Sequence, residues 1–122
     1  MAAKKVEIFY PSFNKNIPQS FIIKTALGQG ITTSDFQNYY VKVYELDIPL
    51  NVNIDDISSL INYFDRLFEL FNSEKNPLSI DPEIQNKIKE NKSHTSMSPG
   101  DVIKINDSYY YVAGFGFQKI LN

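Results

Sequence analysis

The sequence predicts an α+β fold: a small, mainly antiparallel sheet with one long amphipathic helix and one short helix. Short runs of β-branched and aromatic residues, each bounded by turn residues, predict the strands. These runs cover 6–10, 39–46, 102–105, 109–113 and 117–120. Residues 57–71 instead repeat apolar side chains at the three-and-four spacing of a helix, so the helix is expected to cover one face of the sheet.

The sequence predicts secondary structure for only part of the N-terminal quarter. A strand over 6–10 is expected to end at Pro11, because proline lacks the amide hydrogen that a sheet requires. Residues 11–35 show no periodicity that separates a strand from a helix, and Gly28 and Gly30 interrupt them. The spacing of these glycines does not match a phosphate-binding loop, so no nucleotide site is predicted.

The middle of the chain is clearer. The strand over 39–46 is expected to turn Val41 and Val43 toward the core. After it, Asn53 or Asp55 can cap the long helix. The apolar stripe that should bury this helix consists of Ile57, Leu60, Ile61, Phe64, Leu67, Phe68 and Phe71.

The last third predicts the short helix and a hairpin. Asp81-Pro82-Glu83 combines an N-cap, a proline and an acidic residue, which is typical of a helix start, and this surface helix should reach about Asn91. A Pro-Gly-Asp turn then opens the run at 102–105. An Asn-Asp-Ser turn connects it to the run at 109–113, so the two runs are expected to pair.

This C-terminal block also carries a motif. It contains Ser96-Met97-Ser98, then Gly100-Asp101-Val102, a hydrophobic strand, a Tyr-Tyr pair and a final Gly-Phe. The motif resembles that of YodL-like domains and of a related large polyvalent protein-associated domain, and the resemblance covers about 39–120. It implies a small protein or module of a phage, plasmid or other mobile genetic element, and it brings no catalytic activity with it.

Length and composition limit the number of domains and the classes of partner. The 122 residues suffice for one hydrophobic core, so 1–122 is predicted to be a single globular domain. Cysteine is absent and no stretch is long enough to span a bilayer, which suits a cytoplasmic protein without membrane contact. A net charge of -2 and a single arginine, Arg66, argue against direct binding of nucleic acid.

Candidate chemistry is sparse. His94 is the one histidine, and its spacing from Asp101 and the nearby serines matches no nucleophile motif. With one histidine and no cysteine, a metal centre is not expected, and nothing in the sequence requires a cofactor. We therefore predict no catalytic, cofactor-binding or metal-binding residue, and we expect a protein that is not an enzyme.

The sequence thus favours a non-enzymatic protein-binding module. By analogy with other mobile-element proteins, we expect an inhibitor or modulator of a host protein or protein–nucleic acid complex, such as a defence nuclease of a restriction or CRISPR system. Its contacts should combine aromatic and charged side chains. The predicted contact residues are Asp65, Glu69, Glu74, Tyr109, Tyr111 and Phe115.

Two other functions stay open. A nucleic-acid-binding accessory protein would need the lysines of 87–92 to form a continuous basic face with Lys104 or Lys119. A small hydrolase would need His94 and Asp101 to converge in a pocket. The sequence also leaves a homodimer open, and it does not name the partner.

Overall fold

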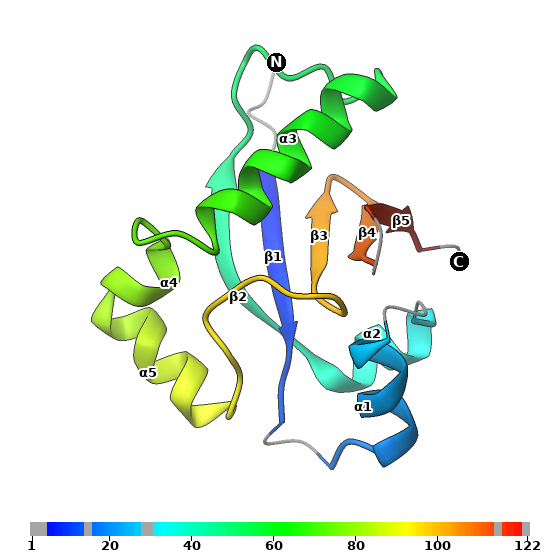
Figure 1. Ribbon diagram of the computed structural model, residues 1–122, viewed down its shortest axis with the longest axis vertical. Helices are drawn as coiled ribbons and strands as arrows, with labels where there is room; N and C mark the ends of the chain where they lie inside the picture. The colour runs from blue at the N-terminus through cyan, green and yellow to red at the C-terminus, as the bar shows by residue number, and fades with distance from the viewer. Residues whose placement is uncertain (1–4, 14–15, 28–30, 114–115, 121–122) are drawn as a thin grey trace.

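The structure, a computed structural model, describes residues 5–13, 16–27, 31–113 and 116–120. Within these residues, five strands form one sheet and helices pack on both of its faces (Figure 1). The elements are β1 (Lys5–Pro11), α1 (Gln19–Ala26), α2 (Thr33–Tyr39), β2 (Tyr40–Asp47), α3 (Ile57–Leu70), α4 (Pro77–Ile80), α5 (Pro82–Glu90), β3 (Val102–Ile105), β4 (Ser108–Val112) and β5 (Phe117–Lys119).

The sheet has the strand order β2-β1-β3-β4-β5, and neighbouring strands are antiparallel throughout. The first strand of the chain therefore lies near the centre of the sheet, where Ile8 is opposite Tyr44 of β2 and Ile103 of β3. The predicted hairpin of β3 and β4 is present, with Lys104 opposite Tyr109. The α+β class and the antiparallel sheet are confirmed.

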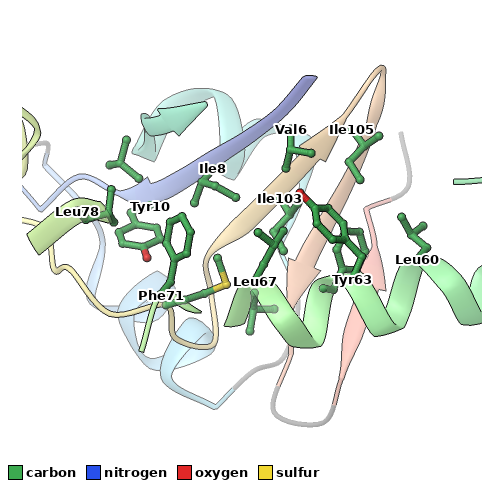
Figure 2. Close-up of a cluster of buried hydrophobic side chains, with 14 of the residues drawn as sticks. Val6, Ile8, Tyr10, Leu60, Tyr63, Leu67, Phe71, Leu78, Ile103 and Ile105 are labelled. Atoms are coloured by element: carbon green, nitrogen blue, oxygen red, sulfur yellow. The ribbon is translucent and has the colours of Figure 1, made fainter. Parts of the chain in front are cut away.

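The main core lies between one face of the sheet and α3 (Figure 2). In a strand, alternate residues face the same side, so β1 turns Val6, Ile8 and Tyr10 toward α3. Val41 and Val43 join this core as predicted. The register of β2 against β1 shifts between Ile8 and Phe9. Tyr44, expected on the opposite side of the strand, therefore packs in the same core.

The apolar stripe of α3 is wider than the part of it that the sheet covers. Leu60, Phe64 and Leu67 are buried as expected, and Tyr63 is buried with them. Ile57, Ile61 and Phe68 were predicted to be buried too. Their side chains are instead 64%, 40% and 36% exposed, because one sheet contacts only one side of a helix.

α1 lies in the segment at 11–35 that the sequence left unread, and α2 begins there and ends at Tyr39, the residue predicted to start the next strand. Thr32 and Asp35 make a reciprocal capping box at the start of α2, in which each side chain accepts a hydrogen bond from the other residue's backbone amide. These helices bury a second cluster on the face of the sheet opposite α3, around Phe21, Tyr40 and Val102. The expectation of one long and one short helix is therefore incomplete.

α4 and α5 lie beside the edge strand β2 (Figure 1). The predicted start of α5 is confirmed: the Asp81 side chain accepts a hydrogen bond from the Glu83 amide, and Pro82 occupies the first turn. Ile88 anchors the helix in the main core. No helix among the described residues is long and apolar enough to cross a membrane.

Candidate functional site

The predicted acidic contact residues lie on and just after α3. Asp65 and Glu69 are exposed and one helical turn apart, and Glu74 is exposed in the turn that follows the helix. Among the described residues, neither Asp65 nor Glu69 makes an ion pair. The Arg66 guanidinium carbon lies 6.0 Å from the centre of the Tyr63 ring. The two carboxylates of the helix are therefore open to a partner.

These acids adjoin the apolar side chains that α3 leaves in solvent. Ile57, Ile61 and Phe68 are four and seven residues apart, so they share one stripe along the helix. Asp65 and Glu69 fall next to this stripe on the side away from the core. We call these five residues the α3 surface. A broad apolar centre with charge at its border is the composition of a protein interface.

The hairpin tyrosines are less available than the sequence suggested. Tyr111 is only 1% exposed, because it lies opposite Val102 on the face that α1 and α2 cover. The prediction that its side chain contacts a partner is therefore wrong. Tyr109 is half-buried, and its ring meets the edge of Phe36 at 4.9 Å. Phe115 lies outside the described residues.

The open side of Tyr109 borders a hollow of about 280 Å³ between α2 and the end of the sheet. Phe36 and Ile120 give the hollow apolar walls, and Thr33 and Gln37 supply neutral polar groups. None of these lining residues is charged or a base. The hollow can accept an apolar group, and none of its described lining residues is a carboxylate, histidine or lysine that would activate a substrate.

His94 and Asp101 do converge, as the hydrolase alternative requires. His94 Nε2 lies 3.1 Å from both carboxylate oxygens of Asp101, and the Ser98 amide donates to one of them at 2.7 Å. Asp101 is completely buried. Burial raises the pKa of Asp101 to about 6, although the hydrogen bond and charge of His94 and the Ser98 amide oppose the rise.

The surroundings of the pair point to a structural role. The His94 ring stacks on the Tyr10 ring, with their centres 4.6 Å apart, and a third of the His94 side chain is exposed. Within the described part of the chain, no serine or threonine hydroxyl hydrogen-bonds to His94. Nucleophilic catalysis needs a hydroxyl within hydrogen-bond reach of the base. Among the described residues, the geometry therefore places a base beside a carboxyl group with no hydroxyl nucleophile in hydrogen-bond reach.

The loop at 91–101, which holds this pair, is attached to the core by polar side chains. Tyr10 donates to the Thr95 carbonyl at 3.1 Å, and Asn76 Nδ2 donates to the same carbonyl at 2.8 Å. Asn72 Nδ2 donates to the Met97 carbonyl at 3.0 Å, and the Met97 side chain is buried in the main core. Through these hydrogen bonds the loop is held against β1, against the end of α3 and against the start of α4.

Gly100 and Tyr40 fix the end of this loop. Gly100 has a φ of +102°, and a Cβ atom there would lie 2.8 Å from Cβ of Thr25 in α1. Only glycine fits such a backbone at such a close approach. Tyr40 donates to the Gly100 carbonyl, and burial and the nearby Asp101 charge raise the pKa of Tyr40, which keeps the hydroxyl protonated. The Gly-Asp-Val motif thus serves the fold.

The lysines do not gather into the face that a nucleic-acid binder would need. α5 lies beside β2, where its Lys87 lines a hollow with Lys42 and Glu45, whereas Lys119 belongs to β5 at the opposite edge of the sheet. Lys104 Nζ lies 3.7 Å from a carboxylate oxygen of Glu7 and 5.3 Å from the centre of the Tyr109 ring. The three lysine positions are therefore separated by other elements or are already engaged.

Comparison with known proteins adds a relative. The chain is 37% identical over 119 residues to the uncharacterized protein R785 of Acanthamoeba polyphaga mimivirus, a match that covers 95% of this chain and 92% of R785. The chain belongs to the family of R785. No family model and no solved structure matches the chain, so the resemblance to YodL-like domains stays a prediction. R785 is the protein of a giant virus, which accords with the expected viral or mobile-element setting.

Sequence reasoning found Asp65 and Glu69 but missed the apolar side chains beside them. The signal was present in the apolar stripe of α3, which has seven members over 57–71. A helix packed on one sheet face buries about a third of its circumference, and this stripe is broader. The surplus predicts exposed apolar residues on such a helix.

Proposed function

We propose that this protein is a non-enzymatic binding protein of a virus or other mobile element. It acts by docking the α3 surface on a host protein or protein–nucleic acid complex, which it inhibits or modulates. A defence nuclease of a restriction or CRISPR type is the kind of target expected. This choice of target follows from analogy with other mobile-element proteins and not from the chemistry of the site.

The observation that carries the proposal is the exposure of Ile57, Ile61 and Phe68 in one stripe beside two carboxylates without ion pairs in the described residues. Isolated exposed apolar residues are ordinary, whereas a row along one helix marks an interaction site. The viral relative supports the setting of the proposal. The half-buried Tyr109 and the buried Tyr111 favour the α3 surface over the hairpin as the site of contact.

The test is an affinity pull-down from host lysate with the tagged protein, with nuclease treatment and at raised salt. It compares the unchanged protein with Ile57→Asp and with Ile80→Asp. The two isoleucines are matched in exposure, at 64% and 65%, but Ile80 lies on α4. The proposal expects a nuclease-resistant host protein that Ile57→Asp loses by about tenfold or more and Ile80→Asp retains.

Two results would contradict the proposal. Recovery of nucleic acid alone, in a salt-labile form, would move the function to the accessory nucleic-acid binder. Equal loss of the host protein by both variants would show that the contact does not depend on the α3 surface.

A further inference from the structure

We infer that the occupant of the α3 surface is an amphipathic helix of a partner protein that carries lysine or arginine beside its apolar side chains. This inference rests on the proposed function and names the chemistry of the partner. It follows from the position of two carboxylates, from the shape of the stripe and from the exclusion of two other occupants.

The charge around the stripe is acidic. Residues 55–75 hold five carboxylates and two cationic side chains, and the acids are Asp55, Asp56, Asp65, Glu69 and Glu74. Asp65 falls between Ile61 and Phe68 in the sequence and beside their row on the helix surface, so a partner that covers both apolar side chains closely approaches this carboxylate. A carboxylate that loses water without gaining a counter-charge destabilises a complex. A cation of the partner at this border offsets that cost and favours the complex.

The shape of the surface favours a helix as the occupant. α3 is 14 residues long, or about 21 Å, and its exposed apolar side chains lie in one row from Ile57 in the first turn to Phe68 in the last. A row of this kind packs against the matching row of a second helix at an axis separation of about 8–10 Å. A partner helix of about four to five turns would cover the whole row.

A second copy of this chain fits the surface poorly. In a twofold interface the same patch meets itself, so the carboxylates of Asp65 and Glu69 would face either each other or apolar side chains. The helix does hold one cation, Arg66, but its guanidinium lies by the Tyr63 ring, on the other side of the acids from the stripe. A membrane fits no better, since an anionic lipid surface repels these carboxylates.

The experiment uses the full chain and synthetic probes. Three fluorescent helical peptides, each about 18 residues long, share leucines at helical three-and-four spacing and carry lysine, glutamate or serine beside them. Binding is measured by fluorescence anisotropy at low and moderate salt. The inference expects the lysine peptide to bind at least about tenfold more tightly than the glutamate peptide, with a preference that salt weakens.

Two double variants test whether the carboxylates of α3 cause the preference for the lysine peptide. Asp65→Lys with Glu69→Lys should reverse the preference, so that the glutamate peptide binds more tightly. Glu83→Lys with Glu90→Lys makes the same change of net charge on the exposed surface of α5 and should preserve the lysine preference. This control separates attraction to α3 from general attraction between a cationic peptide and an acidic protein.

The inference is overturned if the lysine and glutamate peptides bind equally, if none of the peptides binds, or if the lysine preference survives the change at Asp65 and Glu69. If one of these results occurs while recovery of the host protein is still lost in Ile57→Asp, the proposed function is supported and the inferred cationic helix is wrong. If the peptides behave as expected and the lysate yields no host protein, the surface chemistry stands and the proposed function falls.

Discussion

The loop at 91–101 and the outer side of α3 show opposite relations between polarity and burial. The loop is rich in polar side chains, yet its Asp101 is fully buried and its carbonyl groups accept hydrogen bonds from Tyr10, Asn72 and Asn76. The outer side of α3 is rich in apolar side chains, yet it leaves Ile57 in solvent. Polar groups are buried in the first region, and apolar groups are exposed in the second.

This difference distinguishes residues that stabilise the fold from residues that remain available to a partner. Buried polar groups are tolerated when they are hydrogen-bonded, and those of the loop named above are. The exposed stripe of α3 has no such explanation within the described structure. The C-terminal motif at 96–101 therefore describes architecture, whereas the surface that we propose to be functional lies on α3, earlier in the span of 39–120 that the resemblance covers.

The first prediction concerns the loop at 91–101, where a substitution at Gly100 should destabilise the protein most. Gly100→Ala should destabilise the protein by about 4 kcal/mol, because the new methyl group meets Thr25 at 2.8 Å and the backbone has a positive φ of 102°. Urea unfolding measures the change.

Gly116→Ala is the matched control. Gly116 also has a positive φ, of 69°, but a Cβ there would meet no atom within 4 Å. It should cost only about 1 kcal/mol, the cost of the backbone alone. Equal losses in the two variants would show that the approach to Thr25 does not constrain the loop.

The next effect concerns the pH dependence of stability. Burial raises the pKa of Asp101 from 3.8 to about 6, so the folded protein retains a proton that the unfolded chain releases between these values. This contribution is fully present below pH 3.8 and is lost as the pH rises through 6. At about 1.4 kcal/mol per pKa unit, it amounts to about 3 kcal/mol.

Asp101→Asn removes this titration. The free energy of unfolding of the unchanged protein, relative to that of the variant, should fall by about that 3 kcal/mol between pH 3 and pH 8 in urea titrations. Parallel pH profiles for the two proteins would mean that Asp101 does not hold its proton more tightly when folded.

The last prediction concerns the exposed apolar stripe of α3. Ile57→Asp should change the free energy of unfolding by less than about 0.5 kcal/mol, since its side chain is mostly in solvent. Leu60→Ala, at a position on the same helix that is 2% exposed, should cost about 3 kcal/mol. If Ile57→Asp were as costly as Leu60→Ala, the stripe would belong to the core and not to an interface.

The sequence predicted the parts of the fold that depend on local chemistry. The hairpin turn, the start of α5 and the strand at 39–46 follow from turn residues, a capping aspartate and alternation, and all are present. α1 and α2 were missed, although α2 begins with a Thr32–Asp35 capping box. The apolar run at 21–23 of α1 fits a strand as well as a helix, and α2 carries only Phe36 and Tyr39, so neither shows a helical period.

Only the charged residues of the candidate site were predicted from the sequence, and its exposed apolar residues were missed. Charge can be read from a sequence, so Asp65 and Glu69 were identified, and both are exposed. Exposure of apolar residues depends on how much of a helix the sheet covers, which is a tertiary property. The same limit explains the error at Tyr111, which strand alternation alone could assign to either face.

The position of β1 has a consequence for how the chain assembles. β1 begins at Lys5, and one of its two neighbours, β3, begins only at Val102. During synthesis, at about 5–20 residues per second, the N-terminal strand exists for several seconds with one edge unpaired. Contacts between distant parts of a chain also slow folding. The earliest strand of the sheet thus gains its second neighbour only late in synthesis, and in that interval its open edge invites pairing with other nascent chains.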